Sequence, residues 1–395
     1  MKTPTRPPKL PRPEPVPRVR SCLIDRLAPE DVPMFWDRIA QHLPLVEETD
    51  TSAETGEVVV TFCWRDQDAE QVLLFANRLT DETQLADTLL ERHGDTDLWH
   101  ASFRMRADWR ASYAFVVQRP GEPAPWLADG HVGVRAALDR GLRDPRNPDS
   151  CLDRAGISQS VVSLPQAPEQ RWLARRPDVP AGSVVHHEGP DGRDVWLYDP
   201  ADVPADAPLP LVVALDGKVW TSQQSLPTTL DNLIADGMIP PVRAVLASSG
   251  GSDARWTELG DDAGATYVVD ELVPWARSLR AVDEQVVAVG QSLGGLTVLR
   301  AGLRRPDVVT GVVSQSASLW LDDLADLVRP GIATRVHLAW GLQEWVLDGP
   351  HRLLAEQLAA AGVPVEPVPV NGGHDYAWWR GTVADGLRSL LGDHH

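Results

Sequence analysis

Cysteine is scarce in this chain. Its 395 residues include three cysteines, Cys22, Cys63 and Cys151, with no CxxC or other metal-like spacing between them. An odd number without such spacing supports neither a disulfide framework nor a zinc cluster. We therefore expect reduced thiols, and we predict neither a bound metal nor a cofactor.

Lysine and long apolar runs are also lacking. Lysine occurs only at Lys2, Lys9 and Lys218, and the formal net charge is −19. Binding phosphate needs a surplus of cationic side chains over one face, so this charge argues against a nucleic-acid or anionic-membrane partner. No run reaches the roughly 18 apolar residues of a membrane span. The proline-rich first twenty residues contain no signal-peptide core, which leads us to expect a soluble cytoplasmic protein.

The composition is otherwise that of a globular protein, with 43% hydrophobic and 24% charged residues. The length favours two domains. Residues 1–28 are so rich in proline that we predict a disordered or extended arm. From Asp31 to about Leu45, Phe35, Ile39 and Leu43 fall on one helical face, which indicates a short amphipathic helix.

Residues 29–165 have the character of a β domain. Four short β-type segments, EVVVTFCW, EQVLLFAN, LWHASFRM and ASYAFVVQ, lie between Gly56 and Gln118. Their spacing predicts an antiparallel, immunoglobulin-like sandwich, with Trp64, Trp99 and Trp109 mainly in its core. Residues 126–168 are rich in turn-forming residues and are interpreted as a long connector.

Residues 166–395 have the character of an α/β domain. A hairpin, VVHHEG and RDVWLYDP, leads into apolar strands that alternate with helices, which predicts a mostly parallel sheet covered on both faces. The stretch VVAVGQSLGGLTVL runs from Val286 to Leu299 and contains GxSxG. This motif forms a sharp strand-to-helix turn that exposes its serine. We predict an α/β-hydrolase fold with Ser292 as the nucleophile.

A serine hydroxyl needs a base, and the best-placed histidine is His374 in VNGGHDYAWWRG, after the last predicted strand. The acid should follow a strand between the two. Glu344 is favoured, Asp348 is second and Asp375 is third, and a Ser–His dyad without a close carboxylate stays open. Two backbone amides should stabilise the oxyanion. We assign them to Leu293, which follows the nucleophile, and to Lys218 in the turn of ALDGKVW.

The chain resembles the enterochelin esterases, which hydrolyse the trilactone backbone of catecholate siderophores. The stretches that carry the resemblance lie in both predicted domains: FCWRD, DWRASYAF, SLPQAPEQ, ALDGKVW, DARWTEL, GQSLGG, VVSQSASLW and GGHDYAWWRG. The resemblance implies a sandwich that helps to shape the substrate pocket, an esterase D-like catalytic domain and release of iron in the cytoplasm. Ser292 and His374 match the family's catalytic pair.

A ferric catecholate complex is anionic and aromatic, so its pocket should be lined by arginine and tryptophan. Candidates that we predict to lie in loops near the carboxyl ends of strands are Arg255, Arg380, Trp256, Trp320, Trp345, Trp378 and Trp379. The leading hypothesis is a siderophore trilactone esterase acting on a small-molecule substrate. A general carboxylesterase or acyltransferase and a non-catalytic ligand-binding protein are the alternatives.

Overall fold

The computed structural model describes residue 8, residues 17–39 and residues 42–392. The chain forms two compact units. The large unit contains residues 169–370 and the chain from Trp379 onward. The small unit contains the described residues from 17 to 168 and, from much later in the sequence, residues 371–378. The last segment includes His374, so the predicted nucleophile and the predicted base belong to different units.

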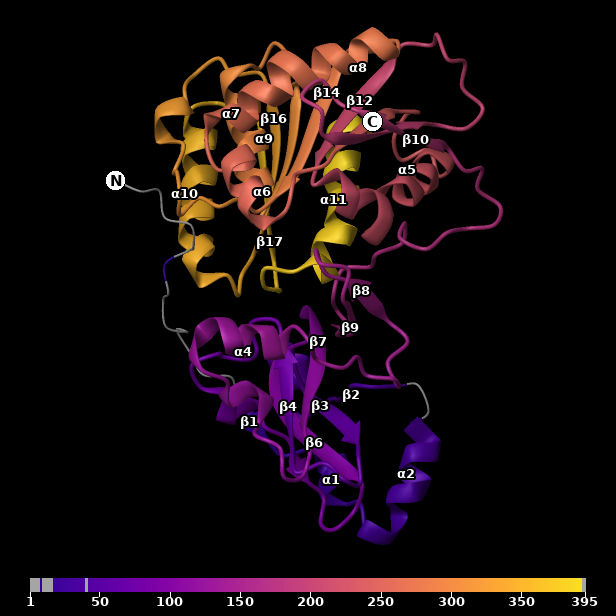
Figure 1. Cartoon of the computed structure of the whole chain (residues 1–395), viewed down its shortest axis with the longest axis vertical. Helices are drawn as coiled ribbons and strands as arrows, with labels where there is room; N and C mark the ends of the chain where they lie inside the picture. The colour runs from indigo at the N-terminus through magenta and orange to yellow at the C-terminus, as the bar shows by residue number, and fades with distance from the viewer. Residues whose placement is uncertain (1–7, 9–16, 40–41, 393–395) are drawn as a thin grey trace. The chain divides into compact units, whose positions relative to one another are not determined.

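The large unit is built on one eight-stranded sheet (Figure 1). The strand order is β10-β11-β13-β12-β14-β15-β16-β17. The pairs β10–β11 and β11–β13 are antiparallel and the others parallel, which confirms the predicted hairpin and parallel sheet. The strands are β10 (Ser183–Glu188), β11 (Asp194–Asp199), β12 (Leu209–Leu215), β13 (Arg243–Ala247), β14 (Val282–Gln291), β15 (Gly311–Gln315), β16 (Arg335–Gly341) and β17 (Val365–Val370).

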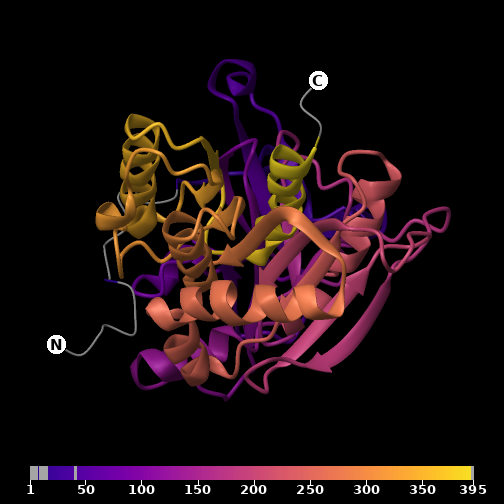
Figure 2. The ribbon, with the colours of Figure 1, turned by 90° about the horizontal axis from the view of Figure 1, so that it is seen from above.

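Helices cover both faces of this sheet (Figures 1 and 2). Alternate apolar residues of β12, β13 and β14 form one buried core with α8 and α9. On the other face, α11 packs closely enough that a Cβ at Gly386 would lie 2.6 Å from Val313 of β15. The helical segments are η4 (Val219–Gln223), α5 (Leu226–Ala235), α6 (Ser252–Leu259), α7 (Asp262–Thr266), η5 (Tyr267–Leu272), α8 (Val273–Leu279), α9 (Leu293–Arg304), η6 (Ala325–Leu327), α10 (Trp345–Ala360) and α11 (Tyr376–Leu391).

The candidate substrate-binding residues were predicted to lie in loops, and for most of them this prediction is wrong. Arg255 and Trp256 lie in α6, Trp345 begins α10, and Trp378, Trp379 and Arg380 lie in α11; Trp320 is in a turn. The prediction placed these residues in loops near the carboxyl ends of strands. The helices α6, α10 and α11 begin shortly after those strand ends, so the residues fall in or just after their first turns.

The small unit contains two antiparallel sheets. Side chains of β3 and β6 from one sheet and of β4 and β7 from the other share one buried core. All four predicted strands are confirmed, and Trp99 and Trp109 are buried as expected. The first sheet contains β1 (Arg18–Val19), β2 (Leu45–Glu47), β3 (Glu57–Arg65), β5 (Glu91–Arg92) and β6 (Leu98–Arg106), and the second β4 (Gln71–Ala76), β7 (Arg110–Gln118), β8 (Ser150–Leu152) and β9 (Ser158–Ser163).

The N-terminal part of the small unit is more regular than predicted. Residues 1–7 and 9–16 of the predicted arm lie outside the described residues. Strand β1, however, pairs with β6, and α1 (Cys22–Asp25) buries Ile24 against Trp36. The amphipathic helix is present as α2 (Val32–Ile39), preceded by η1 (Pro29–Asp31). It ends before Leu45 because residues 45–47 pair with β3.

The segment at 126–168, predicted as a loop-rich connector, is more regular than expected. It contains α4 (Gly130–Leu138) and the strands β8 and β9, and β9 pairs with β7. Short strands between turn-forming residues carry little periodicity of their own, and their pairing partner is distant in sequence. The remaining short helices of the unit are α3 (Ser52–Thr55), η2 (Leu85–Thr88) and η3 (Pro125–Leu127).

Candidate active site

The elbow around Ser292 connects the end of β14 to the start of α9. Ser292 has φ 57° and ψ −118°, a conformation that costs a non-glycine residue about 1–3 kcal/mol. A Cβ at Gly290 would lie 2.2 Å from the carbonyl oxygen of Gly294, so the turn requires glycine there. The Ser292 amide donates to the carbonyl of Gln315 at 3.0 Å, which fixes the elbow to β15. The strand–turn–helix geometry expected of GxSxG is therefore present.

Two sets of backbone amides lie at the same edge of the sheet. Leu293 is the first residue of α9 and Lys218 stands in the turn that leads into η4, and the first N–H groups of a helix have no partner within it. Because β12 and β14 are parallel neighbours, the loop after β12 adjoins the elbow. A Cβ at Gly217 would lie 2.2 Å from the carbonyl oxygen of Leu246, so this loop also depends on a glycine. The Lys218 side chain is exposed.

The Arg255 guanidinium is bound by acceptors from two other segments of the chain. Its guanidinium donates to both carboxylate oxygens of Asp216, at 2.8 Å from Nε to Oδ1 and 2.7 Å from Nη2 to Oδ2. Nη2 also donates to the carbonyl of Gln291 at 3.2 Å. Asp216 has φ 58° and accepts a further hydrogen bond from the Ser249 hydroxyl. Arg255 therefore links the loop after β12 to the residue before the nucleophile.

Glu344 follows β16 and is buried, with 1% of its surface exposed. One carboxylate oxygen, Oε2, accepts hydrogen bonds from the Ser316 hydroxyl at 2.6 Å and from the Gly341 amide at 2.7 Å. Ser316 has φ 48°, and its hydroxyl in turn accepts from the Trp379 indole at 3.0 Å. These contacts fix the orientation of the carboxylate, as the acid of a triad requires.

A row of buried amide side chains crosses the sheet beneath the elbow. The Trp220 indole donates to the Gln291 side chain at 2.8 Å, and Gln291 donates to Gln315 at 2.9 Å. Gln315 then donates to the Trp379 carbonyl at 3.0 Å and to the Thr382 hydroxyl at 2.5 Å. Trp379 is 3% exposed. It is part of the interior, not of a ligand-facing surface as the sequence suggested.

Two of the tryptophans predicted to contact the substrate lie next to each other. The rings of Trp256 and Trp320 meet edge to face with centroids 6.0 Å apart, and both are half-buried. Arg380 is half-buried and donates from Nε to the Gln170 side chain at 3.2 Å. A second hydroxyl, that of Ser318, lies 3.4 Å from the Ser292 hydroxyl.

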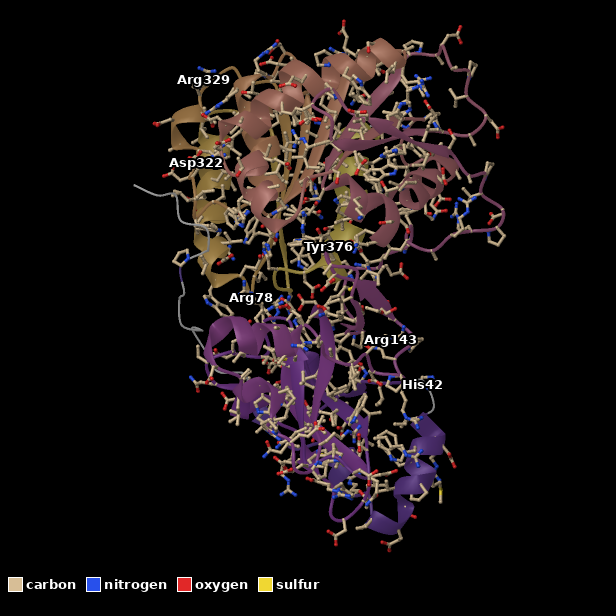
Figure 3. The ribbon with its side chains drawn as sticks, in the orientation of Figure 1. His42, Arg78, Arg143, Asp322, Arg329 and Tyr376 are labelled. Atoms are coloured by element: carbon tan, nitrogen blue, oxygen red, sulfur yellow. The ribbon has the colours of Figure 1, made fainter. Side chains whose placement is uncertain are left out.

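The loop that carries His374 is held within the small unit. Asn77 donates to the His374 carbonyl at 3.1 Å. Asp375 accepts from the Ser112 amide at 2.6 Å through one oxygen and from the Ala377 amide at 2.9 Å through the other. The second bond caps the start of α11. Figure 3 labels Tyr376, the first residue of that helix.

The two glycines before His374 let this loop approach its neighbours closely. A Cβ at Gly373 would lie 2.2 Å from side-chain atoms of both Asn77 and Arg78. The Gly373 carbonyl accepts from the Trp378 indole at 2.6 Å. The His374 loop is therefore shaped by specific contacts that tolerate no added side chain at that point.

The other candidate acids are bound elsewhere. Asp348 accepts from the Trp340 indole at 2.7 Å and pairs with Arg352 one helical turn away. Asp375 is bound by backbone amides as described above. In the described part of the chain, no cluster of three His, Cys, Asp or Glu residues is suited to a metal ion. None of the helices described there has both the length and the hydropathy to cross a membrane.

Several residues that support the site stand outside the motifs that drew attention in the sequence. Ser316 and Asn77 were not assigned roles, and Asp216 was assigned only a place in the DG turn that presents the Lys218 amide. The signal was their position directly after buried strands. Asn77 likewise follows the buried strand β4, but its partner is almost 300 residues away, so its contact with the His374 loop left no local pattern.

A sharply turned serine at the carboxyl edge of a parallel, helix-covered sheet defines the class, an α/β hydrolase. The family models "Enterochelin esterase, N-terminal" and "Putative esterase" match residues 59–173 and 190–390. An iron(III) enterobactin esterase of Dickeya dadantii is 31% identical over 90% of this chain and 92% of the relative. That of Escherichia coli K12 is 29% identical over 84% and 90%.

Solved structures agree with these sequence matches. The ferric enterobactin esterase of Salmonella typhimurium superposes with a TM-score of 0.78 at 25% identity, covering 91% of this chain and 98% of the other. An enterobactin esterase of Shigella flexneri, solved in the presence of enterobactin, has a TM-score of 0.73 at 28% identity, covering 90% and 97%. The chain belongs to the enterochelin esterase family, and it is a carboxylic ester hydrolase.

Proposed function

We propose that this enzyme hydrolyses the ester bonds of a trilactone catecholate siderophore of the enterobactin type. The observation that carries the reaction type is Ser292, held at positive φ between β14 and the N-terminus of α9. The names of the relatives support the substrate class. The ferric form of the siderophore as substrate and a cytoplasmic location are parts of the same proposal.

In the proposed mechanism, the Ser292 hydroxyl attacks a lactone carbonyl while His374 takes its proton. The amides of Leu293 and Lys218 stabilise the oxyanion. When the tetrahedral intermediate collapses, His374 gives the proton to the leaving alkoxide. Water then attacks the acyl-enzyme and gives a proton to His374. When this second intermediate collapses, the acid is released and His374 returns the proton to the Ser292 oxygen. Glu344 holds the imidazole in the required tautomer.

The proposed enzyme has two domains. We place an immunoglobulin-like sandwich at 29–165 and the catalytic domain at 166–395, with residues 1–28 preceding them. The shared core of the two antiparallel sheets supports the sandwich.

Incubation with ferric and iron-free enterobactin, followed by chromatography, tests the function. We expect linear ester-cleaved products, and faster formation from the ferric form. Turnover of simple aryl esters with the trilactones left intact would instead identify a general carboxylesterase. Absence of turnover of both, together with no labelling of Ser292 by a fluorophosphonate, would identify a binding protein.

Arg380 is the arginine of the predicted pocket that we assign to substrate charge. We expect Arg380→Gln to raise KM for the ferric trilactone about tenfold, the effect of losing one charge-assisted hydrogen bond. KM for a neutral aryl ester should not change. Steady-state kinetics with both substrates measures the difference, and an equal rise for both would contradict the assignment.

Asp375 should position the His374 loop. Asp375→Ala leaves the amides of Ser112 and Ala377 without their acceptor, so we expect unfolding free energy to fall by about 1–3 kcal/mol. The displaced loop should lower kcat about 10²-fold. Thermal unfolding and aryl-ester kinetics measure the two effects.

Asp97→Ala is the matched control for that variant. Asp97 also belongs to the small unit and accepts from the Trp36 indole at 2.9 Å and from Arg65. Its loss should lower stability without lowering kcat at a temperature where both variants are folded. Equal kcat losses in the two variants would show that the effect of Asp375 is only structural.

A further inference from the structure

Arg255 joins the two backbone segments that carry the proposed oxyanion donors. It lies in α6, which belongs to neither segment. Its bonds to Asp216 reach the residue two positions before Lys218, and its bond to the Gln291 carbonyl reaches the residue two positions before Leu293. One planar guanidinium thus contacts both segments, in the rigid fork geometry that fixes direction as well as distance.

The ion pair with Asp216 is largely withdrawn from water. The side chains of Arg255 and Asp216 are 12% and 1% exposed. At Asp216 the backbone adopts a left-handed conformation, which an isolated aspartate would leave for lower-energy regions. The guanidinium and the Ser249 hydroxyl both hold its carboxylate. The side-chain bonds therefore stabilise a backbone turn that the chain would not favour alone.

The charge of Arg255 is already balanced. A carboxylate within 3 Å of the guanidinium cancels most of the field that an anionic ligand would experience. This observation opposes the substrate-binding role that sequence analysis assigned to Arg255. Recognition of an anionic siderophore would require a cation whose charge is not neutralised by a buried partner.

We infer that Arg255 is a positioning residue that fixes the amides of Leu293 and Lys218 relative to one another, and that it does not act as a cation for the substrate. This inference rests on the proposed function, because it assumes that these amides bind the oxyanion. Catalytic donors must be held to within about 0.5 Å of the productive geometry. Such precision is needed for every ester, whatever its charge.

The test compares Arg255→Lys and Asp216→Asn with the unchanged enzyme. Lysine keeps the charge but loses the fork. We expect Arg255→Lys to lower kcat about 10²-fold, as loss of one oxyanion donor does elsewhere. The loss should be equal for a neutral aryl ester and for the ferric trilactone, with KM within about threefold of its original value. The rate of Ser292 labelling by a fluorophosphonate should fall in parallel, since the phosphoryl oxygen uses the same donors.

Asp216→Asn distinguishes the positioning role of Arg255 from a substrate-binding role by changing its partner. It leaves the arginine in place without its neutralising carboxylate. A positioning role predicts a lower kcat on both esters, whereas a substrate-binding role predicts a lower KM for the ferric trilactone and an unchanged kcat. The second result, or full aryl-ester activity of Arg255→Lys, would overturn the inference.

Arg300→Lys is the matched control for folding. Arg300 is buried in α9 and pairs with Asp322, which Figure 3 labels, at 2.8 Å. We expect it to lower the thermal midpoint as much as Arg255→Lys while kcat is unchanged. An equal kcat loss in this control would also overturn the inference. Failure of the proposed function itself is recognised separately, because the unchanged enzyme would then leave the trilactones intact or Ser292→Ala would retain aryl-ester activity.

Discussion

Replacing Ser292 by alanine should lower kcat on the order of 10⁶-fold, with both a neutral aryl ester and the ferric trilactone. Losses of this size follow removal of the nucleophile from a catalytic triad, because the acyl-enzyme can no longer form. The alanine keeps the turn, since the bond between the residue 292 amide and the Gln315 carbonyl is made by the backbone. Binding of the ferric trilactone should therefore be retained.

Stopped assays measure kcat, and fluorescence titration with the ferric trilactone measures binding, on one preparation of the variant. Ser318→Ala is the matched control, because Ser318 carries the neighbouring hydroxyl, 3.4 Å from that of Ser292. We expect that control to keep most of its activity. If Ser292→Ala retained turnover while Ser318→Ala lost it, the assignment of the nucleophile would be wrong.

Glu344→Gln should lower kcat about 10³- to 10⁴-fold, as loss of the acid does in related triads. The substitution is nearly isosteric. A glutamine oxygen at the position of Oε2 can still accept from Ser316 and Gly341, so the fold should persist. Its NH₂ group replaces the other carboxylate oxygen and cannot accept the imidazole N–H that the proposed mechanism assigns to Glu344. The imidazole would then favour the wrong tautomer.

Asp348→Asn and Asp375→Asn complete this comparison. We expect each to lower kcat far less than Glu344→Gln does, because Asp348 is bound to Trp340 and Arg352 and Asp375 to backbone amides. Steady-state kinetics of the three variants at one pH gives the order. A loss below tenfold for all three would favour a Ser–His dyad.

Sequence patterns predicted secondary structure best where that structure depends on residues close together in the sequence. The apolar strands of the large sheet, the elbow and the four strands of the small unit were all predicted. Their periodicity and their glycines act over a few residues. Predictions failed at Cys22–Asp25, at 126–168 and at the helices that carry Arg255 and Trp379. There, packing against distant segments decides whether a polar or mixed stretch becomes helix, strand or loop.

The sequence by itself determined the reaction class of this protein, because a sharp GxSxG turn needs only adjacent residues to expose Ser292. Only the tertiary structure decided what holds the site together. The bonds from Arg255 to Asp216 and Gln291, from Ser316 to Glu344, and from Asn77 to His374 each join residues 28 to 297 positions apart. Such contacts leave no local pattern, since they arise only when parallel strands bring their carboxyl ends to one edge and when residues 371–378 fold with the small unit.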